Sequence, residues 1–479
     1  MKASNSLFIL TAALVGATTV AAQETQVASR DDAKPAATAD STTSTTRADS
    51  ARADSAAKAP APKPLLVQEI TIQRYRPTDQ RGINMFETPK TDAVPFTGFR
   101  LGLGASFTQQ FQSLEHSNAA APKLAKDAAG KEYDANALIP IGGGFNNAVA
   151  NLYVNAQLAP GIRVALTSCL SARHHQETWV KDGYILIDDS PFDVAALDEL
   201  MQYLTLRVGH MEINYGDQHF RRTDNGNAIY NPFVGNTLMD AFTTEIGAEA
   251  YLRAKGFMVM GGVFNGESRG MVTRPGERSY AYLGKAGYDR QMSENLRVRL
   301  TGSYFTQDKS TNQTLFSGDR AGSRYYLVME NPVATEKDNF TSGTINPSFR
   351  NKIAAYQINP FVKVGGLELF GILEQTNGRS NGEAKDRTWD HYSAEAVYRF
   401  LKDDKLFVGA RYNTAEGELA GITNTVGATR SQIGGGWFVT PSLMLKAEYV
   451  TQKYNDFPTT DIRNKAKFNG LMMEGVVSF

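Results

Sequence analysis

The feature that most constrains the fold is a two-residue periodicity that recurs along most of the chain. From Thr97 onward, segments of about ten to fifteen residues alternate apolar with polar side chains. One of them reads Leu-Arg-Val-Arg-Leu-Thr from Leu296 to Thr301. Because successive side chains of a strand point to opposite faces, the pattern predicts β-strands with one apolar and one polar face.

The connections between these segments alternate between very short turns and long polar loops. Short turns are expected at 159–160, 254–255, 292–294, 365, 402–403 and 440–441, and long loops at 112–145, 214–240, 307–348, 377–387 and 455–466. One short-turn junction, 188–201, is longer and acidic, and the apolar stretch 325–329 is expected in a folded long loop. This asymmetry is typical of membrane β-barrels, which have short periplasmic turns and longer extracellular loops.

Counting the alternating segments gives the predicted architecture. Sixteen strands are expected to begin near residues 97, 146, 161, 176, 202, 241, 256, 278, 295, 349, 366, 388, 404, 426, 442 and 467. An even number lets the barrel close with both ends on one side. We therefore predict an all-β chain with a 16-stranded antiparallel transmembrane β-barrel over residues 96–479.

The last segment carries an aromatic residue at its end. Leu471, Met473, Val477 and Phe479 share one face of this segment. It resembles the terminal strand of bacterial outer-membrane proteins, whose closing aromatic is read by the assembly machinery. A soluble jelly roll or propeller is the alternative, since alternation occurs there too, but the terminal aromatic and the turn asymmetry favour the membrane barrel.

The first 95 residues differ in composition from the rest. Lys2, an apolar run and small residues before Gln23 predict a signal peptide over residues 1–22. Residues 23–64 are nearly all Ala, Thr, Ser, Asp, Lys and Pro, which predicts a disordered periplasmic tail. Residues 65–95 are expected to form a periplasmic lead-in that packs under or into the next domain. About 30 residues are too few for the plug of an energy-coupled receptor.

Charge and cysteine content exclude several classes. Fifty basic and fifty acidic residues leave no net charge to draw nucleic acid. The single cysteine, Cys169, excludes a disulfide framework. Apart from the N-terminal run, no apolar stretch approaches the roughly 20 residues of a membrane helix. We predict no catalytic site, no metal site and no cofactor.

The polar faces of the predicted strands give a charge pattern for the lumen. A barrel of about sixteen strands leaves an aqueous channel. The basic residues assigned to its wall are Arg100, Arg163, Arg207, Arg253, Lys285, Arg297, Arg299, Lys363, Arg399, Arg411 and Lys446; the acidic ones are Glu245, Glu249, Glu368, Glu374, Glu395, Glu448 and Glu474. The basic excess predicts a mild anion preference, and the basic residues near short turns predict a basic collar at the periplasmic mouth.

Several segments together resemble one known family. They are Trp179-Val-Lys-Asp-Gly-Tyr-Ile185, Leu204-Thr-Leu-Arg-Val-Gly-His210, Glu245-Ile-Gly-Ala-Glu-Ala-Tyr-Leu252, Gly262-Val-Phe-Asn-Gly266 and the terminal Phe479. The chain resembles the phosphate-selective porins, which are sixteen-stranded trimeric anion channels of bacterial outer membranes. The resemblance implies passive diffusion of small hydrophilic or anionic solutes, a homotrimer, and contact with outer-membrane lipid and lipopolysaccharide. His210-Met-Glu212 stands where members carry an aromatic, Lys and Pro, which leaves phosphate specificity open.

The same resemblance suggests a pore constriction. In sixteen-stranded porins the loop between the fifth and sixth strands folds into the lumen, which here is the segment 215–236. Its candidate residues are Asp217, Arg221, Arg222 and Asp224. Opposed carboxylate and guanidinium groups at a narrow level create a transverse field that sorts hydrated solutes. The alternative is a surface loop with solvated charges.

Two other functions stay open from the sequence. A structural or adhesive outer-membrane barrel with an occluded pore fits the same strand pattern. A barrel enzyme would need Ser, His and Asx residues near the rim, and the histidines that could serve are His174, His175, His219 and His391. No nucleophile elbow accompanies them, and adjacent histidines on a strand point to opposite faces.

Overall fold

The computed structural model of the chain describes residues 72–88, 90, 94–170, 178–190, 192, 194–268, 276–319 and 322–479. The expected signal peptide, residues 1–22, and the expected tail, residues 23–64, lie outside the described residues. The lead-in is described over 72–88, 90 and 94–95.

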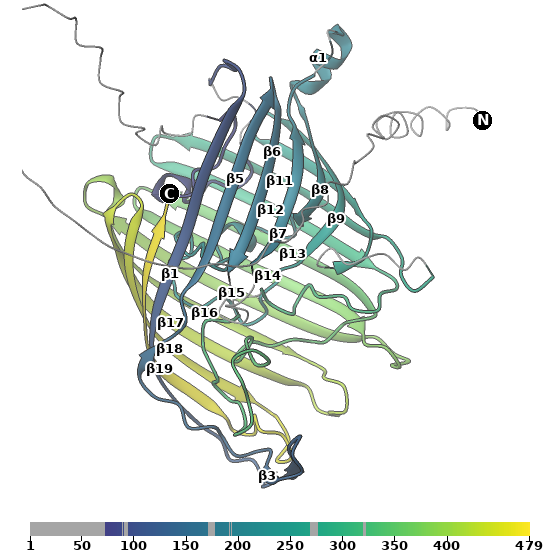
Figure 1. The fold of residues 1–479 in the computed structure, drawn as a ribbon, viewed down its shortest axis with the longest axis vertical. Helices are drawn as coiled ribbons and strands as arrows, with labels where there is room; N and C mark the ends of the chain where they lie inside the picture. The colour runs from purple at the N-terminus through teal and green to yellow at the C-terminus, as the bar shows by residue number, and fades with distance from the viewer. Residues whose placement is uncertain are drawn as a thin grey trace, which may run out of the picture. The chain divides into compact units, whose positions relative to one another are not determined.

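Sixteen long strands pair antiparallel in a closed ring (Figure 1). They are β1 (Arg100–Ser117), β5 (Val149–Ala159), β6 (Ile162–Leu170), β7 (Trp179–Ile187), β8 (Leu204–Glu212), β9 (Thr244–Ala254), β10 (Phe257–Phe264), β11 (Ala281–Ser293), β12 (Leu296–Gln307), β13 (Lys352–Val364), β14 (Leu367–Arg379), β15 (Arg387–Phe400), β16 (Leu406–Gly417), β17 (Val426–Thr440), β18 (Leu443–Asn455) and β19 (Lys467–Ser478). The predicted fold class, a 16-stranded antiparallel barrel, is confirmed.

The shorter elements lie in the connections or, for β4 (Gly144–Phe145), beside the wall strand β1. They are β2 (Leu124–Lys126), β3 (Glu132–Asp134), the helix α1 (Ala195–Met201), and the 3-10 turns η3 (Gln218–Phe220) and η5 (Lys402–Asp404); a further 3-10 turn, η1 (Gln80–Gly82), lies in the lead-in. The helix α1 and the strand β3 lie at opposite ends of the barrel (Figure 1). Among the described helices, none is long and apolar enough to cross a membrane.

The barrel closes where its first and last long strands meet. Strand β1 pairs with β5 on one side and with β19 on the other. At the end of this seam, the Ala105 N–H donates to the Phe479 carbonyl at 2.9 Å, and the Phe479 N–H donates to the Ala105 carbonyl at 3.0 Å. The terminal aromatic therefore belongs to the seam that closes the ring.

The two faces of the wall differ as the alternation predicts. On β17, the Ile433 side chain is 68% exposed on the outer face, whereas its neighbour Gln432 is 1% exposed. On β16, Val408 and Tyr412 are exposed while Arg411 is buried. An apolar outer face with a polar inner face suits a barrel surrounded by lipid.

Two long loops pack inside the wall. One joins β8 to β9, residues 213–243, and is called the lumen loop below. The other joins β12 to β13, residues 308–351. It contains Tyr325, whose O–H donates to Glu448 of β18 at 2.6 Å, and Arg324, which pairs with Glu474 of β19 at 3.0 Å. The stretch 325–329 therefore belongs to a folded loop, not to a wall strand.

Candidate functional site in the barrel lumen

The lumen loop crosses the interior of the barrel. It is buried throughout, apart from four half-buried residues. Asn225 donates to the carbonyl of Ala150 on β5 at 2.7 Å. The Val234 N–H donates to Glu448 of β18 at 2.8 Å, and Lys446 Nζ donates to the Phe233 carbonyl at 2.8 Å. In the ring only β19 and β1 separate β18 from β5, so these bonds hold the loop against one arc of the wall.

Asp217 anchors the start of the lumen loop to the opposite wall. Its carboxylate accepts two hydrogen bonds from Arg299 of β12, both at 2.8 Å, and pairs with Lys285 of β11 at 2.8 Å. Thr301 donates a further hydrogen bond at 2.8 Å. Burial raises the pKa of Asp217, but the two cations outweigh burial and hold the pKa below its ordinary value.

Arg221 lies against acidic residues on the next part of the wall. Its Nη2 is 2.6 Å from Glu395 of β15 and 3.5 Å from Glu368 of β14. Its Nη1 also donates to Asn84 of the lead-in. The guanidinium is 3% exposed, so an uncompensated charge here would be costly, and the two carboxylates supply the compensation.

Arg222 and Asp224 belong to a second buried network. Arg222 pairs with Asp240 at 2.6 Å and with Asp319 of the β12–β13 loop at 3.0 Å. Asp224 pairs with Lys181 of β7, and lies 3.9 Å from Arg222. The four candidate constriction residues thus each meet opposite charges directly, which weakens any field that they project across open water.

The four basic wall residues singled out from the sequence all contact acidic side chains inside the barrel. Arg207 lies 3.2 Å from Glu249, Arg297 lies 2.7 Å from Asp289, and Arg411 lies 2.7 Å from Glu395. Arg299 contacts Asp217, Asp289 and Glu87. These pairs place both signs of charge on the inner face at short range.

Two acidic partners were missed from the sequence. Asp289 lies four residues after Lys285 on β11, so both side chains point to the same face of the strand. Continuing the alternation from Lys285 to Asp289 would have assigned Asp289 to the lumen. Glu87 lies in the lead-in, which has no strand periodicity, so no sequence signal identifies it. It pairs with Arg299 at 2.8 Å and with Lys285 at 3.2 Å.

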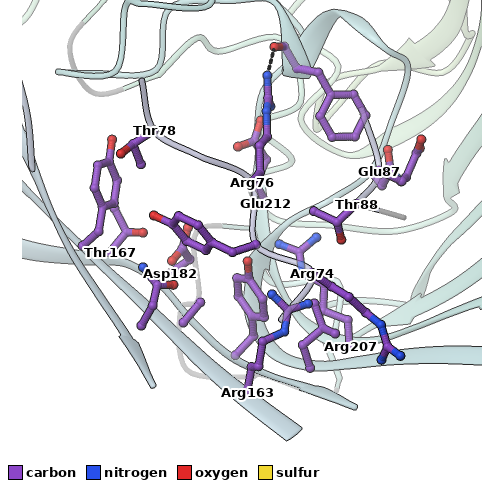
Figure 2. A pocket seen from close by; sticks show the side chains of 18 of the residues that line it. Arg74, Arg76, Thr78, Glu87, Thr88, Arg163, Thr167, Asp182, Arg207 and Glu212 are labelled. Carbon is purple, nitrogen blue, oxygen red and sulfur yellow. Dashed lines mark hydrogen bonds between the residues drawn. The ribbon is translucent and has the colours of Figure 1, made fainter. Parts of the chain in front are cut away.

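A cavity of about 300 Å³ lies between the lead-in and strands β5 to β9. Figure 2 shows Arg74 and Arg76 of the lead-in beside wall residues that include Arg163, Asp182 and Arg207. The arginines that line it are Arg74, Arg76, Arg163, Arg207, Arg222 and Arg253; the carboxylates are Glu87, Asp182, Glu212 and Asp224. A second cavity, of about 750 Å³, lies at the short-turn end, between the lead-in and turns such as 291–295 and 403–404.

The histidines considered for catalysis are dispersed. His219 contacts Asn214 at 2.8 Å in the lumen loop, and His391 contacts Glu374 at 2.9 Å on the inner face of β15. His174 and His175 lie outside the described residues. Burial, and next the charge of Lys285, hold the pKa of His219 well below its ordinary value, so its ring is neutral at pH 7.

A family model described as phosphate-selective porin O and P matches residues 174–474. The chain belongs to this family. It is therefore an outer-membrane porin, and its barrel is a passive channel. The match supports a channel in preference to an enzyme.

Solved structures similar to this porin share little sequence with it. An anion-selective porin from Comamonas acidovorans is 11% identical with a TM-score of 0.47, over 80% of this chain and 100% of that one. The outer membrane channel DcaP of Acinetobacter baumannii is 9% identical with a TM-score of 0.47, over 80% and 99%. OmpT of Vibrio cholerae is 10% identical with a TM-score of 0.46, over 81% and 100%. No curated protein matches the sequence significantly.

Proposed function

We propose that this porin carries small hydrophilic solutes and ions through a water-filled lumen with a mild preference for anions. The observation that supports the preference is the cavity beside β5 to β9, which has six arginines against four carboxylates. Within the described part of the chain, the hydrogen bonds donated by Arg76 and Arg253 go to carbonyl and hydroxyl oxygens, not to carboxylates. Such guanidinium groups keep positive charge available to a passing anion.

We propose the lumen loop as the narrowest level of the channel, with Asp217, Arg221, Arg222 and Asp224 at the constriction. The loop's bonds to β5, β12 and β18 support this role, because a loop held on several sides of the wall reduces the open cross-section. Paired charges at this level fix the loop in place.

Export and assembly complete the proposal. A signal peptide over residues 1–22 would direct the chain to the periplasm, with residues 23–64 as a tail there. The family resemblance suggests a homotrimer surrounded by lipid and lipopolysaccharide. N-terminal sequencing of the mature protein, expected to begin at Gln23, and native mass spectrometry test these two points.

Single-channel recording tests the transport function. Purified full-length protein in a planar bilayer is expected to give discrete conductance steps, and a reversal potential in a KCl gradient that favours chloride modestly over potassium. Absence of discrete steps from folded protein would contradict the channel. A preference for potassium would contradict the proposed anion preference but not the channel function.

A double variant tests the constriction. Arg221→Ala with Arg222→Ala removes two cations that hold the lumen loop, so conductance should rise and the chloride preference should fall. Glu395 and Glu368 keep the partners Arg411 and Arg399 in this variant. The control is Arg463→Ala, which removes one exposed-loop arginine paired with Asp461 at 2.8 Å. If the double variant behaves like the control, the loop does not set the constriction.

A further inference from the structure

The lead-in contacts the wall on all sides of the ring. Six of its residues contact six different wall strands. In ring order, the pairs are Gln73 with Gln157 of β5, Thr88 with Arg253 of β9, Glu87 with Lys285 of β11, Phe86 with Phe361 of β13, Asn84 with Glu368 of β14, and Thr78 with Ser478 of β19. Strands β5 and β13 stand opposite each other in the ring of sixteen. A segment in contact with both must cross the lumen.

The crossing occurs near the short-turn end. The Gln80 N–H donates to the carbonyl of Pro441, in the β17–β18 turn, at 3.0 Å, and its side chain donates to the Asp403 carbonyl at 2.8 Å. Lys90 donates to the carbonyl of Leu204, the first residue of β8, at 2.7 Å. These partners come from two turns and from the start of β8, so the lead-in is fastened across the mouth at this end.

The lead-in also packs against the lumen loop. Phe86, 2% exposed, lies edge-on to Phe361 and to Phe220 of the loop, with ring centroids 5.3 and 5.7 Å apart. Arg76 lies 3.8 Å from the ring centroid of Tyr230 and donates to the Phe220 carbonyl at 2.9 Å. Lead-in and loop therefore form one continuous layer within the barrel.

Glu87 is the charged contact of this layer that bears on selectivity. Its carboxylate lies 2.8 Å from Arg299 and 3.2 Å from Lys285, while the same two cations hold Asp217. Asp289 also lies 3.1 Å from Arg299, but its charge is balanced by Arg297 at 2.7 Å. Apart from that pair, two wall cations face two carboxylates, one from each inward segment. Without Glu87, this level of the lumen would carry one net positive charge, at residues that are 4% and 2% exposed.

We propose that residues 72–88, together with Lys90, form a plug that restricts the channel at the short-turn end, and that Glu87 sets ion selectivity by neutralising Lys285 and Arg299. This inference rests on the proposed channel function. It makes the lead-in a determinant of both conductance and selectivity.

The first test replaces residues 72–90 by a Gly–Ser segment of equal length in the full chain. Native protein and variant are compared in planar bilayers after both show the heat-dependent gel mobility of a folded barrel. We expect the variant's conductance to be several-fold larger. Equal conductance would overturn the plug. A silent native protein beside a conducting variant would overturn passive conduction by the native protein and leave the plug in place, whereas silence from both overturns the channel function and the plug with it.

The second test needs only a point change, so it stands even if the replacement variant does not fold. Glu87→Gln removes the charge while keeping the size and polarity of the side chain. It should move the reversal potential in a KCl gradient toward the equilibrium potential of chloride. The matched control is Asp79→Asn, because Asp79 lies in the same segment and pairs with Arg81 at 2.8 Å, away from the wall cations. An unchanged reversal potential for Glu87→Gln, or an equal shift in both variants, would overturn the selectivity role.

Discussion

Lys285 and Arg299 illustrate how single residues acquire their role in this lumen. Both lie on neighbouring wall strands, and both are almost fully buried although they carry charge. A buried cation is tolerated only with close counter-charges. Asp289 of the wall also lies 3.1 Å from Arg299, but the counter-charges shared by both cations come from two segments outside the wall, through Asp217 and Glu87. The lumen loop and the lead-in are therefore bound by the residues that would otherwise attract anions.

The acidity of Glu87 gives a pH prediction. Burial raises its pKa, but Lys285 and Arg299 outweigh burial and hold the pKa well below its ordinary value. A group with a depressed pKa contributes its stabilisation above the unfolded value, about 4.3 for Glu, and loses it only as the pH falls through the lower folded value. The charged groups that face Glu87 are the cations Lys285, Arg299, Arg253 and Arg76 and the carboxylate of Asp217.

We therefore expect the difference in reversal potential between native protein and Glu87→Gln to persist from pH 7 to about pH 4.3. The measurement is a pH series of single-channel recordings on both proteins. Other carboxylates that titrate affect both proteins alike, so their effects cancel in the difference between the two reversal potentials. A difference that disappears by about pH 5.5 would mean that Glu87 titrates like an ordinary carboxylate and is not held by the two cations.

At the scale of elements, the lumen loop depends on a close approach of backbones. A Cβ atom on Gly226 would lie 2.6 Å from the Cα of Ala150 on β5 and 2.6 Å from the carbonyl oxygen of Ser106 on β1. These are backbone atoms of the wall, so neither can move aside cheaply. Only glycine lets the loop lie against the wall here.

Gly226→Ala is accordingly expected to lift the loop from β1 and β5 and to increase single-channel conductance. The matched control is Gly261→Ala on β10, where an added Cβ meets no atom within 4 Å. The control should keep the native conductance. If Gly226→Ala also keeps it, the contact with β1 and β5 does not define the width of the channel.

At the scale of the whole molecule, the outer face of the wall is the part exposed to lipid. Ile433 lies at the middle of β17 and Val439 near its end, and both point outward. A lysine on the lipid face costs about 2–4 kcal/mol at the midplane of the bilayer and about 0–1 kcal/mol near its surfaces.

We expect Ile433→Lys to lower the free energy of unfolding by about 2–4 kcal/mol and Val439→Lys by about 0–1 kcal/mol. Urea titration of protein folded in lipid vesicles measures both. Selectivity should not change in either variant, because both side chains point away from the lumen. Equal losses at the two positions would contradict the placement of β17 across the membrane.

The sequence by itself determined the barrel and its family. A two-residue period assigns each side chain to one face of a strand, and this is why strand number, turn positions and the inward direction of Arg299 and Arg411 follow from local order. Tyr325 and its neighbours were correctly kept out of the wall because one further strand would break the even count.

Only the tertiary structure decided what fills the lumen. The partners of Asp217, Arg221, Arg222 and Asp224 come from strands and loops far away in the chain, and no local period encodes such pairs. The path of residues 72–88 across the mouth is decided in the same way, since an irregular segment takes its course from the charges and cavities that the closed wall offers. The two-residue period specifies which face of the wall a side chain lies on, whereas closure of the ring specifies which residues it contacts in the lumen.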